Sequence, residues 1–415
     1  MADTRPPAPY FPRLYAGFAA AYLLSYVYRT VNALISPDLS AELGIGASSL
    51  GLLTSAYFLA FAAMQIPAGM LLDRHGPRRV EPVLLAIAGC GALGFAASDS
   101  LAGLAASRAA VGAGVAVCLM APLKAIATWY PRERQASLSG WMMVAGGSGA
   151  LLATAPLAAV LTVMSWRGVF VGLSIATFAA AALIFLLVPD VPRQGTPAGW
   201  REQWEGVRRV FRNPRFWWLS PLAATGMGSF MAIQGLWSVP WLVEVDGYSR
   251  EVAAAHLLVM GAAILVGYFG LGMFATRLAQ RGIGARHLFA IGFAISVGAL
   301  GMIVMRPFAF TYFPWALYGL GSAVNVLGFT VLSEGFPREL TARANTALNL
   351  LMFGGSFAAQ WGIGVLVDVA RATLGADSAG GLRIAFTLVL AVDVIAYAWF
   401  AFGWRRHAHS APAIA

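Results

Sequence analysis

The sequence predicts an all-α integral membrane protein with roughly twelve membrane-spanning helices. The 415 residues are 59% hydrophobic and only 11% charged, whereas soluble domains average about a quarter charged residues. Apolar segments of about 20 residues, the length that crosses a bilayer, alternate with short polar turns. The arginines gather in alternate turns, so the net charge of +10 does not indicate a nucleic-acid surface.

The apolar segments define the expected spans. They lie at about 13–36, 49–71, 82–99, 103–129, 137–162, 168–188, 215–243, 252–274, 287–305, 311–334, 344–367 and 383–404. With the N-terminus in the cytoplasm, most arginines fall in cytoplasmic turns. The opposite side holds only Arg167, Arg250, Arg306, Arg371 and Arg383. This asymmetry predicts a multi-pass protein of the plasma (inner) membrane with both termini in the cytoplasm.

The turn between the second and third expected spans holds the most informative motif, Gly69-Met-Leu-Leu-Asp-Arg-His-Gly-Pro-Arg-Arg79. An ordinary positive-inside turn would explain its arginines, but not its two glycines and its aspartate. The spacing resembles the loop between the second and third helices of the major facilitator superfamily, where a charge network holds the cytoplasmic side closed. The matching residues, which form a gating motif in that family, are Gly69, Asp73, Arg74, Gly76, Arg78 and Arg79.

Both halves of the chain carry related turns at nearly one offset. Gly272, Arg277 and Arg281 repeat the spacing of the first motif, and the Pro-Arg-Glu of 131–133 recurs at 337–339. The resemblance therefore covers the whole chain. It implies two pseudo-symmetric six-helix bundles, 1–188 and 215–415, which rock about a central site to give alternating access. Residues 189–214 are expected to form a cytoplasmic linker with an amphipathic helix, on the inner leaflet or docked to a soluble partner.

A polar stripe marks the first span. Tyr22, Ser25, Arg29, Asn32 and Ser36 recur at three- and four-residue steps and so share one face of a helix. An arginine at this depth can reach the outer headgroups, but the accompanying stripe favours a role facing a cavity. There its planar, permanently charged guanidinium suits a carboxylate or a phosphate.

The run Tyr28-Arg29-x-x-Asn32 is similar to the first helix of two anion-handling branches of this superfamily. These are the anion:cation symporters for sugar acids and other carboxylates, and the organophosphate:phosphate antiporters. The resemblance implies that Arg29 holds the anionic group of the substrate, beside Tyr28 and Asn32. The organophosphate branch usually has a second arginine on the seventh helix. Here none lies between Arg215 and Arg250, which disfavours a doubly charged phosphate.

Two further cations lie in the fourth expected span. Lys124 is the only lysine of the chain, and we expect it to be a second contact for the anion. The alternative is a side chain that extends to the cytoplasmic surface. Arg108 lies ~160° around the same helix from Lys124, if the helix is continuous. We therefore interpret Arg108 as a structural or proton-linked residue.

The family resemblance implies that the seventh and tenth spans also line the cavity. Aromatic and amide side chains there would hold and orient the substrate, although packing is the plain alternative. The substrate-binding candidates are Gln234, Trp237, Tyr318 and Asn325. For proton coupling the candidates are Asp393, which is isolated near the middle of the last span, together with Arg108 and Glu334.

The sequence thus predicts a monomeric secondary transporter that imports a small organic anion, a carboxylate, by proton symport. The alternatives are an organophosphate antiporter, a proton-coupled multidrug or metabolite exporter, and a non-transporting receptor. The exporter is disfavoured because its usual fifth-helix signature, G-P-x-x-G-G, is absent or broken here. The sequence has neither a phosphate-binding loop nor a metal-spaced cluster of ligands, so we expect no enzyme, cofactor, metal or nucleic-acid partner.

Overall fold

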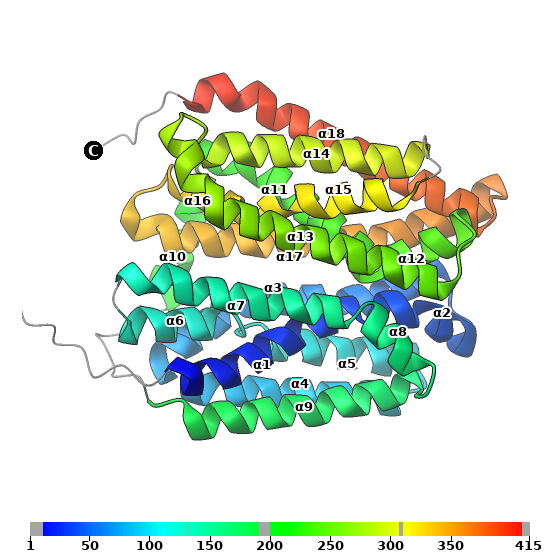
Figure 1. The fold of residues 1–415 in the computed structure, drawn as a ribbon, viewed down its shortest axis with the longest axis horizontal. Helices are drawn as coiled ribbons and strands as arrows, with labels where there is room; N and C mark the ends of the chain where they lie inside the picture. Colours follow the sequence, from blue (N-terminus) through cyan, green and yellow to red (C-terminus); the bar gives the residue numbers. More distant parts are fainter. Residues whose placement is uncertain (1–10, 131, 191–199, 307–309, 409–415) are drawn as a thin grey trace, which may run out of the picture. The chain divides into compact units, whose positions relative to one another are not determined.

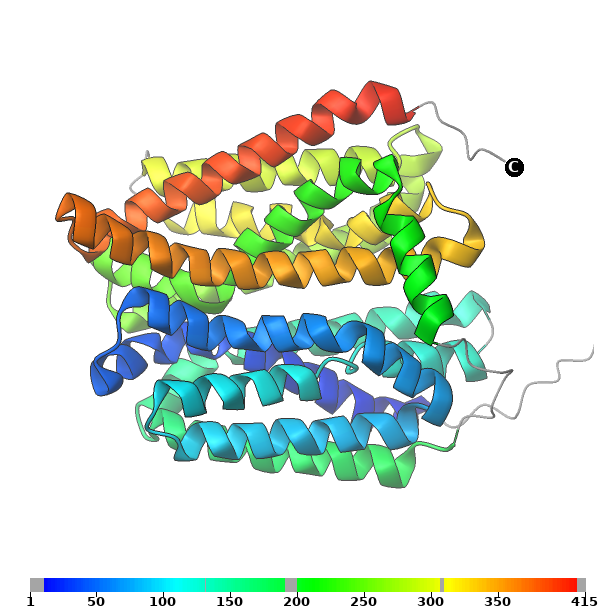
Figure 2. The same ribbon diagram turned by 180° about the vertical axis from the view of Figure 1, so that it is seen from behind.

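The computed structural model describes residues 11–130, 132–190, 200–306 and 310–408, and their secondary structure is helical throughout (Figures 1 and 2). The helices form two compact units. Unit 1 comprises Met1–Leu43 and Ala56–Ala198, and unit 2 comprises Gly44–Ser55 and Gly199–Ala415. Helix α3 (Ala47–His75) begins in unit 2 and continues in unit 1.

Unit 1 is a bundle of helices joined by short turns. In addition to α3, its helices are α1 (Phe11–Thr30), α2 (Asn32–Leu43), α4 (Pro77–Ala97), α5 (Leu101–Gly114), α6 (Met120–Trp129), α7 (Arg132–Leu152), α8 (Ala155–Leu161) and α9 (Trp166–Leu187). Helix α4 packs along α5 and α9, and α1 packs along α7 and α9 (Figure 1). Small residues allow the close approach: a Cβ atom on Gly112 of α5 would collide with the backbone of Tyr57 on α3.

Unit 2 repeats this scheme of packing. Its helices are α10 (Trp200–Phe211), α11 (Pro214–Ala232), η1 (Ile233–Trp237), α12 (Ser238–Pro240), η2 (Trp241–Val245), α13 (Arg250–Gln280), α14 (Ala285–Met305), α15 (Tyr312–Ser322), η3 (Ala323–Val326), α16 (Leu327–Ser333), α17 (Arg338–Leu374) and α18 (Ser378–Ala408). Helix α11 packs along α17, and α14 packs along α15 and α18. The first expected span of each unit thus meets the fifth, and the third meets the fourth and the sixth.

Among the described residues, eight helices are long and apolar enough to cross a bilayer, and the α7–α8 pair, bent by 42°, makes a ninth if it is one span. The other expected spans, 13–36, 103–129 and 215–243, are each divided. Helix α1 gives way to α2 at Val31, α5 and α6 are separated by turns at 115–119, and α11 continues into the π-helical segments η1 and η2. We expected a single span at each of these positions, and the periodicity of apolar residues does not reveal such breaks.

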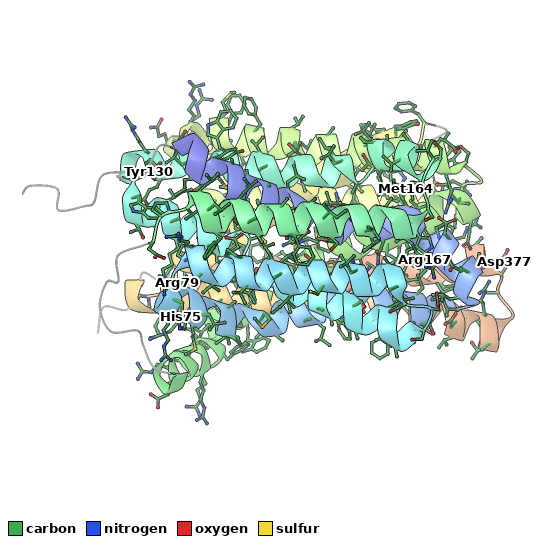
Figure 3. The ribbon with its side chains drawn as sticks, turned by 90° about the horizontal axis from the view of Figure 1, so that it is seen from below. His75, Arg79, Tyr130, Met164, Arg167 and Asp377 are labelled. Atoms are coloured by element: carbon green, nitrogen blue, oxygen red, sulfur yellow. The ribbon has the colours of Figure 1, made fainter. Side chains whose placement is uncertain are left out.

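The α3–α4 turn and the end of α6 lie at one end of the unit 1 bundle. Figure 3 shows His75 and Arg79, from this turn, at the same end as Tyr130, which follows α6. Met164 and Arg167, from the α8–α9 turn, lie at the opposite end.

Candidate functional site

Unit 1 places its polar residues at interruptions of the helices. Arg29 and Asn32 flank the break between α1 and α2, and Val31 at the break is fully buried. The second interruption, 115–119, divides the fourth expected span. In the hydrocarbon layer, irregular backbone is tolerated only where it is buried in protein or lines a cavity. Both breaks therefore face the interior of the protein.

Arg29 occupies a pocket of hydroxyl groups and aromatic rings. Its side chain is only 6% exposed. Nε donates to the hydroxyl of Tyr57 over 3.2 Å, and one terminal nitrogen donates to the Ser25 hydroxyl over 3.4 Å. The guanidinium carbon also lies 4.7 Å from the centre of the Tyr26 ring and 4.9 Å from that of Phe61. These contacts hold the cation inside unit 1 and orient it.

The stripe predicted on the first span lies in the interior. Tyr22, Ser25, Arg29, Asn32 and Ser36 are all buried. Both side-chain polar atoms of Asn32 lack a hydrogen-bond partner within the described part of the chain. A buried amide without partners costs free energy and calls for an explanation such as a ligand. The interior placement agrees with a cavity-facing stripe, but the role in substrate binding stays a prediction.

Arg108 connects α5 to the end of α1. It is 1% exposed, and one terminal nitrogen donates to the backbone carbonyl of Tyr28 over 2.9 Å. The other two guanidinium nitrogens have no hydrogen-bond partner among the described residues. The hydroxyl of Tyr28 shares a 2.9 Å hydrogen bond with Thr177 on α9. Hydrogen bonds thus fix Tyr28 through both its backbone carbonyl and its hydroxyl group. They also fix the backbone position of the neighbouring Arg29.

Lys124 lies beside the gating motif. Its Nζ forms a 2.6 Å ion pair with Asp73 and donates to the carbonyl of Leu72 over 2.8 Å. Both partners belong to the end of α3. Sequence reasoning assigned Lys124 to the substrate and Asp73 to the motif, because the periodicity of single spans does not show which helices meet. The structure joins the two residues, and a substrate contact through Lys124 stays a prediction.

The rest of the gating motif forms the turn from α3 into α4. Gly76 has φ 77°, a conformation that glycine adopts readily, and it is the N-cap of α4. Arg78 and Arg79 each lie 3.4 Å from the carboxylate of Asp190, which follows α9. Arg74, by contrast, is exposed. The arginine pair thereby ties the start of α4 to the end of α9 with partly exposed ion pairs.

The candidates of unit 2 also coincide with irregular backbone. Gln234 and Trp237 lie in the buried π-helical segment η1, and Asn325 lies in the 3₁₀ segment η3. Such π segments often mark functional sites. The indole of Trp237 donates to the backbone carbonyl of Gln360 over 2.9 Å. Tyr318 is buried, and the centre of its ring lies 5.8 Å from the centre of the Phe230 ring. The amide of Asn325 donates to a backbone carbonyl, while its Oδ1 has no partner in the described residues.

The expected proton-coupling residues are placed differently from one another. Asp393 on α18 is 4% exposed and lies near the hydroxyl groups of Ser229 and Thr225 on α11. Glu334 follows α16 and is exposed. Asp393 is therefore an interior carboxyl group, whereas Glu334 lies at the surface.

Sequence reasoning missed one buried acid, Glu81. We began the third span at Pro82 and left Glu81 in the basic turn, but α4 begins at Pro77 and places Glu81 one turn inside. Its side chain is fully buried. The Gly76-Pro77 pair could have revealed this, because proline favours the first position of a helix.

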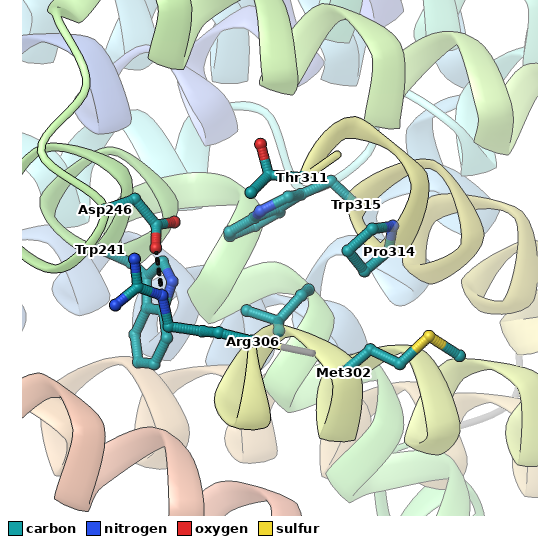
Figure 4. Close-up of a pocket in the computed structure, with 8 residues that line it drawn as sticks. Trp241, Asp246, Met302, Arg306, Thr311, Pro314 and Trp315 are labelled. Carbon is teal, nitrogen blue, oxygen red and sulfur yellow. Dashed lines mark ion pairs between the residues drawn. The ribbon is translucent and has the colours of Figure 1, made fainter. Parts of the chain in front are cut away.

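A narrow cavity in unit 2 is lined by none of the candidate residues described above (Figure 4). Its lining includes Trp241, Thr311 and an ion pair of 2.9 Å between Nε of Arg306 and Oδ1 of Asp246. Burial raises the pKa of Asp246 above its ordinary value, and Arg306 opposes this shift. The ion pair joins the turn after η2 to the end of α14, and we interpret it as structural.

The chain matches a known protein family over most of its length. Residues 18–360 match the family model of the Major Facilitator Superfamily. The hexuronate transporter of Escherichia coli (strain K12) is 29% identical over 290 residues, which cover 61% of this chain and 66% of that protein. The probable L-galactonate transporter of the same strain is 27% identical over 162 residues, 37% of this chain and 34% of that protein. The aligned regions thus span just under two thirds of the first relative and about a third of the second.

The fold is also similar to that of solved membrane proteins. A bacterial homologue of the human lysosomal transporter Spinster, in an inward-facing and unoccupied conformation, superposes with a TM-score of 0.77. That comparison covers 96% of this chain and 97% of the other at 19% sequence identity. At this identity the likeness establishes the fold alone.

Proposed function

Because this chain belongs to the Major Facilitator Superfamily, we propose that it is a secondary transporter that imports an organic acid anion by proton symport. The substrate is a sugar acid of the hexuronate or aldonate type, a carboxylate that carries several hydroxyl groups. Twelve spans with both termini in the cytoplasm, and alternating access in the plasma membrane, belong to the same proposal.

The observation that carries the proposal is that Arg29 and Asn32 both lie buried at the break of the first span. A guanidinium binds a carboxylate through two parallel hydrogen bonds. The amide of Asn32 offers a donor and an acceptor to a neighbouring hydroxyl group. Since the Asn32 amide is buried without partners in the described structure, a hydroxylated ligand would remove the cost of that burial.

The relatives support the same substrate class. The hexuronate transporter and the probable L-galactonate transporter are named for sugar acids with a single carboxylate. Within unit 2, Oδ1 of Asn325 and Oε1 of Gln360 are also buried without partners among the described residues. Such groups suit the hydroxyls of a sugar acid better than an apolar drug. A doubly charged phosphate remains disfavoured, because no arginine or lysine lies between Arg215 and Arg250.

Flux into proteoliposomes that contain the full chain tests this function. Labelled glucuronate, galactonate, glycerol 3-phosphate and a lipophilic cation are offered with and without an inward proton gradient. We expect uptake of one of the two sugar acids, accelerated by external acid. Uptake of glycerol 3-phosphate in exchange for internal phosphate, or of the lipophilic cation alone, would contradict the proposal. Binding of a sugar acid without any flux would indicate a receptor.

A further inference from the structure

Glu81 is a buried carboxyl group to which the proposed site assigns no role. It lies one turn inside α4, with a side-chain exposure of 0%. Neither carboxylate oxygen has a hydrogen-bond partner within the described part of the chain. An ionised carboxylate in this setting would be a desolvated, unpaired charge, which is very costly. The neutral acid is therefore the form that this environment favours.

Packing directs Glu81 toward the interrupted span. Glu81, Leu84 and Ala88 fall at three- and four-residue steps and so share one face of α4. A Cβ atom on Gly114, at the end of α5, would lie 2.5 Å from the carbonyl oxygen of Leu84 and from the amide nitrogen of Ala88. The face of α4 that carries Glu81 is therefore pressed against the end of α5, where the turns at 115–119 begin.

The interruption places Cys118 near Glu81. Cys118 is buried in these turns, and no hydrogen bond joins its thiol to the carboxyl group in the described structure. The backbone here departs from regular α-helix: the amide of Ala116 bonds to the Ala113 carbonyl, and that of Cys118 to the Val115 carbonyl, both three residues back. In secondary transporters, coupling ions bind at such discontinuous helices.

The charged groups on helices packed against α4 have partners other than Glu81. Arg108 on α5 bonds to Tyr28, Lys124 on α6 to Asp73, and Arg167 at the start of α9 to Glu42 and Asp99. Within the described structure, Glu81 thus belongs to none of these ion pairs.

We propose that Glu81 carries the coupling proton. Its carboxylate takes up one proton from water on the side from which the organic anion enters, and the acid returns that proton to water on the other side. One O–H bond forms and one breaks in each cycle, with no change in oxidation state. The inference rests on the proposed function, since it assigns the proton of that symport to one residue. The turns at 115–119 are the element that would change the exposure of Glu81 to water.

The test compares Glu81→Gln with the wild-type chain in proteoliposomes, with labelled glucuronate and galactonate as probes. Exchange of labelled for unlabelled substrate requires no net proton movement, so Glu81→Gln should retain it. Accumulation above the external concentration under an inward proton gradient should be lost. The substrate-induced rise of pH in a weakly buffered medium should disappear with it. Glu81→Asp, which restores a carboxyl group, should recover part of both signals.

The matched control is Glu251→Gln, which removes an exposed carboxyl group at the start of α13. It should accumulate substrate as the wild-type chain does. Accumulation by Glu81→Gln at the wild-type level overturns the assignment to Glu81 alone. Loss of exchange in a Glu81→Gln protein that melts at the wild-type temperature also overturns it, because Glu81 would then serve substrate movement itself. Failure of the wild-type chain to move either acid overturns the proposed function and this inference together.

Discussion

The side chain of Arg108 donates a 2.9 Å hydrogen bond to the backbone carbonyl of Tyr28, the residue that precedes Arg29. This contact connects the fourth expected span to the first at the point where α1 ends. Its place ~160° around the fourth expected span from Lys124 suggested a structural or proton-linked role for Arg108. The structure identifies the Tyr28 carbonyl as the group that Arg108 contacts, and the effect of losing this contact can be measured.

Two replacements of Arg108 test its contact with the Tyr28 carbonyl. Arg108→Lys keeps one donor for the Tyr28 carbonyl, whereas Arg108→Leu leaves that buried acceptor without a partner. An unsatisfied buried acceptor costs about 1–3 kcal/mol, so the leucine variant should be less stable than the lysine variant by that amount. Thermal unfolding in detergent measures the difference. Equal stability of the two variants would show that the hydrogen bond does not support the fold.

Replacing Asn32 by leucine should stabilise the protein, whereas replacing Arg108 by leucine should destabilise it. Asn32→Leu removes a buried amide that has no partner in the described structure, and it should stabilise the protein by about 1–3 kcal/mol. The same change should weaken binding of a sugar acid, since we propose that the amide binds a substrate hydroxyl. Thermal unfolding and equilibrium binding on one preparation give both values. A more stable variant with unchanged affinity would exclude Asn32 from the substrate site.

The gating motif offers a matched pair of glycines. Gly76 has φ 77° and ψ 162°, where other residues are strained, so Gly76→Ala should cost about 1–3 kcal/mol of stability. Gly69 lies inside α3, and a Cβ atom there would meet nothing within 4 Å. Gly69→Ala should therefore be neutral or stabilising by up to ~1 kcal/mol. Thermal unfolding of both variants tests the turn geometry, and equal losses at the two positions would refute it.

The Lys124–Asp73 pair can be examined with a double-mutant cycle. Both side chains are partly exposed, at 30% and 52%, so the coupling free energy from thermal unfolding should be about 0.2–1 kcal/mol. Lys124→Ala and Asp73→Ala should also change the transport rate to a similar extent. A loss of substrate affinity in Lys124→Ala but not in Asp73→Ala would instead establish Lys124 as a contact for the anion.

The comparison of sequence with structure shows which features local patterns encode. The polar stripe around Arg29 was evident from its periodicity, because residues three and four apart share a helix face. The break at Val31 and the turns at 115–119 were not, since they depend on packing between helices. For the same reason the sequence showed Lys124 and Asp73 as separate features, although they form an ion pair. Glu81 was assigned to a turn because it follows two arginines and precedes a proline.

The central claim is that Arg29 binds the carboxylate of a sugar acid. The most direct measurement is the shift in melting temperature that glucuronate and galactonate cause in the purified protein, since a ligand that binds only the folded form stabilises it. Wild type is compared with Arg29→Gln, with Arg29→Lys, and with Arg209→Gln as a matched control on the exposed surface. We predict a shift that is retained in Arg209→Gln, reduced in Arg29→Lys and lost in Arg29→Gln. A full shift in Arg29→Gln, or stabilisation by lipophilic cations alone, would contradict the account.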